Sequence, residues 1–244
     1  MDKVIPSLEE AIADIKEGAT IAVPGFFSAG VPRLLLRAII AKGTKNLTLA
    51  SGCGPLLGAH EELDMLVKNG QLKKVIDSYA LYRSASKGMQ HPFEQAVRAG
   101  EIELEVYPMG TLAEKYRAAG AGIAAFYTPT GVGTMVEDGI SNIHKYQKKE
   151  KRVFNGREYI LEVALKPDYA FIHAATGDSE GNLHYRRTAR NFNHVMAMAA
   201  RVTIAEVENL VEPGGLEPEH IHTPGVYVQR VVKVPRIEIK IGID

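Results

Sequence analysis

The first candidate for chemistry is a glycine-rich loop that reads Pro24-Gly25-Phe26-Phe27-Ser28-Ala29-Gly30-Val31-Pro32 and follows an expected strand. Glycine lets a ligand approach the backbone closely, and amide groups exposed before a helix stabilise a developing negative charge. Such a loop suits the oxyanion of a thioester, and its candidate residues are Gly25, Phe26, Phe27 and Gly30. A tight strand-to-helix turn without a chemical role explains the same residue types.

The second candidate is Ser51-Gly52-Cys53-Gly54, which follows the expected strand from Leu47 to Ala50. Ligands of open α/β sheets bind beyond the carboxyl ends of the strands. We therefore predict that these four residues line a substrate pocket. Cys53 raises the hypothesis of a nucleophile, but no pattern identifies an activating base, and a single cysteine is commonly a small buried hydrophobic residue.

The stretch from Glu105 to Thr134 combines a short apolar strand, a helical pattern and two glycine-rich turns. We place in the same pocket the residues that flank the helical pattern, namely Met109, Gly110, Thr128, Thr130 and Gly131. The run from Gly120 to Ala125 matches a dinucleotide-binding G-x-G-x-x-A only superficially. That fingerprint opens a helix after a strand, whereas this run follows a helix.

The remaining polar residues point to structure rather than to catalysis. Asp178 and Glu180 lie in an Asp-Ser-Glu-Gly run that is typical of a turn, and His220 and His222 lack a third ligand placed by a motif. We predict no metal site. A polar group is expected to fix loops or to face a partner chain: Asn182, Arg190, Asn191 and Asn193.

The elements that must position these residues alternate between strands and helices. Ser7 and Glu10 have capping-box spacing, so a helix is expected over residues 7–17, followed by a strand over 20–23 and a helix over 34–41. Later strands are expected over 47–50, 74–77, 102–106, 169–173 and 202–206. This alternation predicts an α/β fold with a mainly parallel sheet flanked by helices.

One segment departs from the alternation. Asn155-Gly156 separates two short apolar runs, which predicts a projecting β-hairpin with a type I′ turn. Its approach is rich in basic residues: Lys145, Lys148, Lys149, Lys151 and Arg152. A solvated hairpin base explains these charges, and contact with the phosphates of a nucleotide-bearing ligand is the alternative.

Length and composition narrow the classes of protein. A chain of 244 residues, 45% hydrophobic, is expected to form one domain, here 1–231, followed by a tail, 232–244, that forms an edge strand or docks a partner. Its 29 basic residues balance 29 acidic ones, so it lacks the field that gathers nucleic acid or an anionic membrane. The single cysteine, the lack of a signal peptide and the lack of a membrane-spanning run predict a soluble cytoplasmic protein.

The stretch from Glu105 to Thr134, the loop from Pro24 to Pro32 and the segment from Thr188 to Asn193 together resemble the alpha subunit of the two-chain 3-oxoacid coenzyme A-transferases, family I. The resemblance runs from about Ser7 to Val231. It implies a NagB/RpiA/CoA transferase-like fold and a role for the glycine-rich loop beside the thioester.

Several residues depart from the pattern of that family. Pro24 and Phe27 replace usual glycines, and Gly52, Cys53 and Met109 replace three amide side chains that are common in members acting on 3-oxoacids. If those amides help to hold a polar acyl group, the pocket of this chain is less polar and has a different shape.

The resemblance also implies that the nucleophile lies outside this chain. In the family, the beta subunit carries a glutamate that attacks the thioester and becomes an enzyme-CoA thioester, which predicts ping-pong kinetics. Glu180 is a poor match to the beta-subunit motif. We therefore expect no catalytic residue here, no tightly bound cofactor, a beta-subunit partner in an α2β2 assembly, and transfer of CoA from an acyl-CoA such as succinyl-CoA to a carboxylic acid, first of all a 3-oxoacid such as acetoacetate.

Two other functions fit the same residues. A hydrolase or decarboxylase of CoA thioesters on this fold explains the changes at Gly52, Cys53 and Met109 as changed chemistry. A non-catalytic CoA-binding or regulatory subunit is the other alternative. Release of free thiol without an acceptor acid distinguishes the hydrolase from the transferase.

Overall fold

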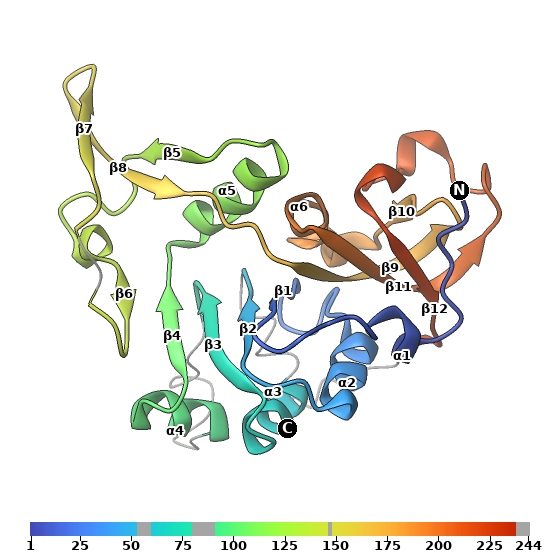
Figure 1. Cartoon of the computed structure of the whole chain (residues 1–244). Helices are drawn as coiled ribbons and strands as arrows, with labels where there is room; N and C mark the ends of the chain where they lie inside the picture. Colours follow the sequence, from blue (N-terminus) through green and yellow to red (C-terminus); the bar gives the residue numbers. More distant parts are fainter. Residues whose placement is uncertain (53–59, 80–90, 146–147, 238–244) are drawn as a thin grey trace.

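The computed structural model describes residues 1–52, 60–79, 91–145 and 148–237. A nine-stranded sheet crosses the molecule, with helices on both of its faces (Figure 1). Its strands are β1 (Thr20–Ala22), β2 (Leu47–Ala50), β3 (Leu72–Asp77), β4 (Glu103–Val106), β6 (Ile140–Ser141), β9 (Tyr169–Asp178), β10 (Leu183–His184), β11 (Val202–Val211) and β12 (Arg230–Lys233). The helices are α1 (Leu8–Ala11), α2 (Arg33–Lys42), α3 (His60–Lys68), α4 (Pro92–Ala99), α5 (Met109–Gly120) and α6 (Asn193–Ala199), with short 3₁₀ turns η2 (Met135–Asp138), η3 (Arg187–Arg190), η4 (Pro218–His220) and η5 (Gly225–Tyr227).

The strand order is β12-β11-β9-β1-β2-β3-β4-β6, and β10 pairs with β9. All neighbours along this order are parallel except β4 and β6, and the β9–β10 pair is also antiparallel. The predicted α/β fold with a mainly parallel sheet is therefore confirmed. Strands β1 to β4 end at the same edge of the sheet, where the predicted site loops follow them.

Side chains of the central strands alternate between two cores. Ile21 belongs to the core shared with α1 to α4, whereas its neighbour Ala22 belongs to the core shared with α5 and α6. Leu49 and Ala50 divide in the same way. Such strands are buried on both faces, which explains why they are short apolar runs in the sequence.

The first helix is shorter than the prediction over residues 7–17. Ser7 caps it as expected, because its Oγ accepts from the Glu10 amide at 3.1 Å, but the helix ends at Ala11. The next carbonyl groups accept from distant side chains: Arg230 donates to Ala11 O at 2.6 Å, and Lys42 donates to Ile12 O at 2.9 Å. These long-range donors replace the helical hydrogen bonds.

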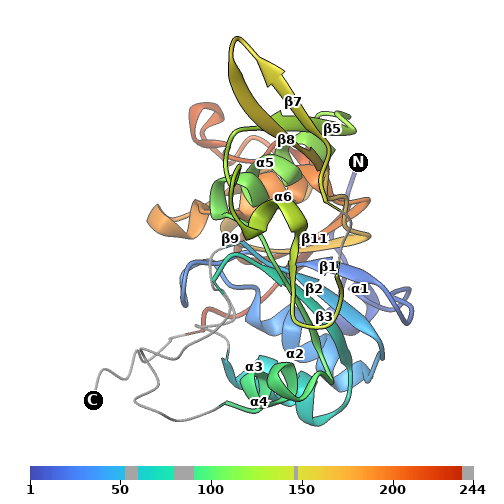
Figure 2. The same cartoon turned by 90° about the vertical axis from the view of Figure 1, so that its left-hand side faces the viewer.

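The predicted hairpin is confirmed. Strands β7 (Lys151–Phe154) and β8 (Arg157–Val163) pair antiparallel, and β5 (Ala125–Thr128) adds a third strand on the other side of β8. Asn155 and Gly156 have φ values of 49° and 76°, the two positive values that a type I′ turn requires. Figure 2 shows the hairpin rising above α5, away from the main sheet.

The basic residues at the hairpin base are neutralised within the chain. Lys148 and Lys151 contact Glu137 at 3.3 and 3.0 Å, and Arg152 contacts Glu150 at 2.7 Å. These pairs favour the structural interpretation of the basic run over a phosphate-binding one.

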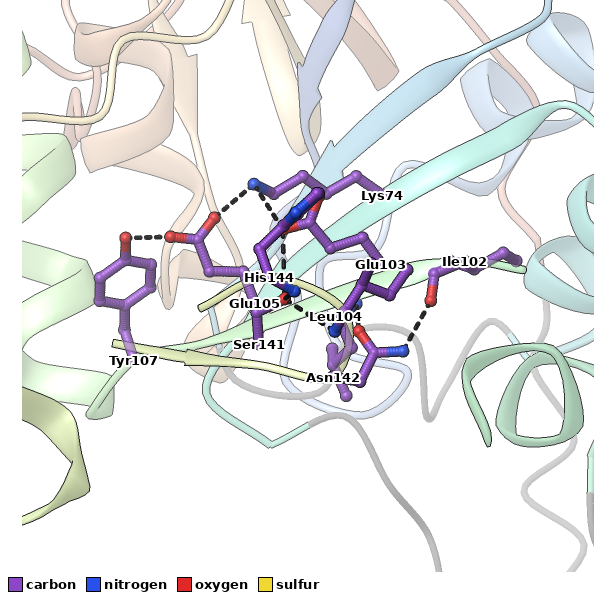
Figure 3. A network of polar contacts seen from close by, with 10 residues as sticks. Lys74, Ile102, Glu103, Leu104, Glu105, Tyr107, Ser141, Asn142 and His144 are labelled. Carbon is purple, nitrogen blue, oxygen red and sulfur yellow. Dashed lines mark hydrogen bonds and ion pairs between the residues drawn. The ribbon is translucent and has the colours of Figure 1, made fainter. Parts of the chain in front are cut away.

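A polar network fastens β6 to the edge of the main sheet (Figure 3). Lys74 on β3 lies 3.2 Å from Glu103 and 2.6 Å from Glu105, both on β4. Asn142, next to β6, accepts from the Leu104 amide at 2.6 Å and donates to Ile102 O at 2.9 Å. An antiparallel edge strand of two residues therefore has side-chain support beyond its few backbone hydrogen bonds.

A buried charge cluster joins the three-stranded sheet to α5. Lys115 on α5 contacts Glu162 on β8 at 3.1 Å, and Lys149 contacts the same carboxylate at 2.5 Å. Lys115 and Glu162 are 5% and 2% exposed, so neither charge is solvated by bulk water. Burial lowers the pKa of Lys115 although the charge of Glu162 opposes the change.

At the other edge, β12 crosses the predicted domain boundary at residue 231 and pairs with β11. Residues 238–244, most of the expected tail strand, lie outside the described residues, so the division of the chain at 231 and the role of the tail stay predictions. Among the described helices, none is both long enough and apolar enough to cross a membrane.

Replacing Glu162 tests the buried charge cluster. We expect Glu162→Gln to lower the free energy of unfolding by about 3 kcal/mol, because two lysines then share a buried site without a counter-charge. Glu158→Gln is the matched control: Glu158 also contacts a lysine, Lys151 at 3.2 Å, but its side chain is 55% exposed, so about 0 to 1 kcal/mol is expected. Urea unfolding measures both; equal losses for the two variants would contradict the assignment.

Glu137 gives a pH-dependent prediction. The Gly133 amide donates to its carboxylate at 2.6 Å, and this bond, with the lysines, lowers the pKa of Glu137 from 4.5 to about 2. A lowered pKa in the folded state means that the ionised carboxylate stabilises the fold above pH 4.5 and that this stabilisation is lost as the pH falls towards 2. The difference in unfolding free energy between wild type and Glu137→Gln should shrink between about pH 5 and about pH 3. A difference that does not change over this range would refute the carboxylate's role.

Candidate active site

The glycine-rich loop between β1 and α2 is a tight turn in the structure. Phe26 and Ala29 exchange backbone hydrogen bonds, each with an N···O distance of 3.0 Å. Phe27, inside the turn, has a φ of 50°, in the left-handed region that favours glycine. The rings of Phe26 and Phe27 pack edge to face with centroids 5.1 Å apart, and about half of each side chain is exposed. The turn therefore presents two aromatic rings to the outside, and the Phe26 amide is already bonded within it.

The end of this loop packs tightly against the segment that precedes α6. Gly30 has a φ of 73°, and a Cβ at this position would lie 2.5 Å from Ala189 O. The Asn193 amide donates to Gly30 O at 3.0 Å and to Ala189 O at 2.8 Å, while its Oδ1 accepts from the His173 amide at 3.0 Å. Asn191 likewise donates to Ala29 O at 3.0 Å. The predicted loop-fixing role of these asparagines is confirmed.

The residues after β2 form the floor below that segment. The Tyr116 hydroxyl, fully buried on α5, donates to Ser51 O at 2.8 Å, and burial raises the pKa of Tyr116 well above its usual value. The Phe192 ring lies against Gly52, where a Cβ would be 2.6 Å from ring carbons. Phe192 also packs edge to face on Tyr116, with centroids 6.3 Å apart. Position 52 therefore has no room for a side chain unless Phe192 moves.

Above this floor lies a cavity of about 570 Å³ with an almost entirely apolar wall. Its lining comes from the turn after β1, from α5 and from the segment before and within α6: Phe26, Met109, Ala113, Thr188, Asn191, Phe192, His194 and Val195. The structure thus brings together two residues of the predicted site, Phe26 and Met109, that are far apart in the sequence.

The other predicted pocket residues do not line this cavity. Gly110 has open space around its Cα, and Gly131 packs against Val136 in a turn where the Thr128 hydroxyl accepts from the Thr130 amide at 3.2 Å. This turn follows β5, in the three-stranded sheet. Cys53 and Gly54 lie outside the described residues. For these positions the assignment to the substrate pocket stays a prediction.

A second cavity, of about 490 Å³, lies at the same junction and has a charged wall. Ser28, Gly30 and Ala189 contribute to it, so the two segments that meet at Asn193 line a cavity on each side. Its charged residues come from β9, β11 and the ends of the chain segments around them: Arg33, His173, Arg186, Glu206, Glu208 and Arg236.

Glu206 organises the charged cavity. It is 1% exposed, and its carboxylate accepts from the Leu35 amide at 2.8 Å, so it caps α2, which begins after Pro32 without a side-chain cap of its own. The other carboxylate oxygen lies 2.9 Å from His173 Nδ1. Burial disfavours the charged form of the His173 ring, but the hydrogen bond and the charges of Glu206 and Glu208 outweigh it, so the pKa of His173 is raised.

Phe192, His194 and Val195 were not predicted as cavity residues, and neither was the buried group around Glu206. One signal was present: Met109 and Ala113 are four residues apart on an expected helix and therefore share a face. The contact between Glu206 and α2 spans 171 residues, and no local pattern marks such a contact.

The Asp178 carboxylate accepts from the Glu180 and Asn182 amides at 3.0 and 2.9 Å, so the predicted turn is confirmed. Throughout the described ranges, no group of three or more His, Cys, Asp or Glu side chains is arranged to hold a metal ion.

Comparison with known proteins agrees with this architecture. Residues 5–234 match the family model described as Coenzyme A transferase. The chain is 45% identical over 242 residues to the alpha-type subunit of the succinyl-CoA:3-ketoacid coenzyme A transferase of Helicobacter pylori strain J99, covering 99% of this chain and 96% of that protein. It is 44% identical over 237 residues to the corresponding subunit of the 3-oxoadipate CoA-transferase of Pseudomonas putida, covering 96% of this chain and 94% of that protein.

Among solved structures, a variant of the decarboxylase AibA/AibB superposes with a TM-score of 0.77 at 27% identity, covering 96% of this chain and 84% of that one. The family match spans nearly the whole chain, and the two relatives share more than two fifths of its residues. This protein therefore belongs to the coenzyme A transferase family.

Proposed function

We propose that this chain is the alpha subunit of a hetero-oligomeric CoA-transferase that moves CoA from an acyl-CoA donor, for example succinyl-CoA, to a carboxylic acid, and that a 3-oxoacid is the first acceptor to test. One observation carries the proposal: the turn at Phe26, the start of α5 at Met109 and the segment around Phe192 surround one cavity beyond the carboxyl ends of β1 and β4. The names of the two relatives support the same activity and the same place in a two-chain enzyme.

The exchange proceeds without oxidation or reduction. The partner's glutamate attacks the donor thioester, so a C–O bond forms, the C–S bond breaks and CoA leaves as a thiolate. The thiolate attacks the glutamyl carbonyl of the resulting anhydride and releases the donor acid as a carboxylate. The acceptor carboxylate then repeats the two steps in reverse, which gives the new acyl-CoA and restores the glutamate. One oxygen atom of the acceptor acid ends in the glutamate, and no net proton is consumed.

This chain contributes position and electrostatics to that sequence. The Phe26 amide donates within its own turn, so the contact with the thioester oxyanion falls to the neighbouring amides of Gly25 and Phe27. The apolar cavity receives the acyl group. A beta subunit supplies the nucleophile in an α2β2 assembly, CoA thioesters are substrates rather than resident cofactors, and the single cysteine suits the cytoplasm.

The packing of Gly30 against Ala189 tests the role of the junction. Gly30→Ala should lower kcat/KM roughly 10- to 100-fold, because the new Cβ must push the 186–193 segment away from the turn. Gly18→Ala is the matched control, since Gly18 has nearly the same φ, 78° against 73°, but open space around it. The control carries the same backbone strain without the steric clash. Equal losses of activity in the two variants would show that strain alone is responsible.

The experiment that tests the function is co-expression with the beta chain encoded beside it, followed by an assay of CoA transfer from succinyl-CoA and butyryl-CoA to a panel of acids. We expect acceptor-dependent exchange with ping-pong kinetics from the complex and no exchange from the alpha chain alone. Thiol release without an acceptor would instead establish a hydrolase. An intact complex that is inactive with every pair of substrates would refute the transferase assignment.

A further inference from the structure

We propose that the apolar cavity holds the far end of the acyl group and that this enzyme therefore selects acids with a hydrocarbon tail over dicarboxylic acids. The inference rests on the proposed transferase function and adds the chemical class of its substrates. It concerns both acids, because in a ping-pong exchange the donor acid leaves the place that the acceptor acid then occupies.

The shape of the cavity suits a chain of carbon atoms. Phe26 and Met109 approach it from the turn after β1 and from α5, and their side chains are 46% and 44% exposed. Phe192 closes the floor, because its ring lies directly on Gly52. A volume of about 570 Å³ holds a short alkyl group easily, and covering the exposed faces of Phe26 and Met109 favours an apolar occupant.

The polar groups of the wall are already used. Asn191 donates to Ala29 O at 3.0 Å and to Thr188 O at 2.8 Å, and its Oδ1 accepts from the Phe192 amide at 2.6 Å. His194 lies at the same wall, where burial and then the charge of Arg190 lower its pKa. At neutral pH the His194 ring is therefore uncharged, and it offers no counter-charge to an anion.

No cationic side chain lines the cavity among the residues that the structure describes. Arg190 is exposed and is not part of the wall. The nearby arginines Arg33 and Arg186 line the other cavity, across the turn, and Arg186 is paired with Glu208 at 3.2 Å. A second carboxylate on the substrate would thus lose its hydration without gaining a partner, which is strongly unfavourable. A methyl group in the same place has no such cost.

Butyrate and succinate provide a matched test, because both have four carbon atoms and differ at the far end only. With the co-expressed complex and one fixed acceptor, acetoacetate, we expect kcat/KM for butyryl-CoA to exceed that for succinyl-CoA by at least about tenfold. With one fixed donor, acetoacetate should likewise exceed 3-oxoadipate. Equal or better use of the dicarboxylic substrates by an active complex overturns this inference and leaves the transferase function standing. Inactivity with every pair overturns both.

A substitution can reverse the preference. Met109→Arg places a guanidinium at the cavity wall, so we expect the ratio of kcat/KM for butyryl-CoA to that for succinyl-CoA to fall by about tenfold or more, chiefly through a lower KM for succinyl-CoA. Met65→Arg is the control, since Met65 lies on α3 with a similar exposure, 48%, and does not line the cavity. Gel filtration checks that both complexes assemble. An unchanged ratio in an assembled Met109→Arg complex would show that the acyl tail binds elsewhere.

Discussion

The candidate site depends on the buried amide of Asn193. This side chain is fully buried, and its amide group binds Gly30 O, Ala189 O and the His173 amide. It thereby joins the turn after β1, the segment before α6 and strand β9. A buried amide with several hydrogen-bond partners is costly to disturb, because each lost partner leaves a polar group unsatisfied. The same contact requires glycine at position 30, since a Cβ would collide with Ala189 O.

Two cavities of opposite character follow from this junction. On one side the wall is apolar and belongs to Phe26, Met109 and Phe192. On the other side charges are held in place by structure: Glu206 caps α2 and contacts His173, and Arg186 contacts Glu208. Charges committed to a helix cap and to ion pairs are not available to a substrate without loss of these contacts. The separation explains how a chain with balanced overall charge presents a nearly uncharged acyl pocket.

The departures of this chain from its family concentrate at the apolar cavity. Phe27 adopts a left-handed conformation where the family usually has glycine, so the chain accepts backbone strain to place an aromatic ring beside Phe26. Gly52 lacks a side chain, and the Phe192 ring occupies the space beside it. Met109 adds a flexible apolar side chain to the wall. The three changes act in one direction, towards a less polar pocket.

The sequence by itself determined what local patterns encode. Short apolar runs gave the central strands because both faces of a parallel sheet are buried, Asn155-Gly156 gave the hairpin turn because both residues accept positive φ, and the loop motifs indicated the family. The tertiary structure alone decided where α1 ends, through Arg230 and Lys42, and which residues share a cavity. Phe26, Met109 and Phe192 meet only after the sheet brings the ends of distant strands together. Contacts over such separations depend on packing, and packing leaves no periodic signal in the chain.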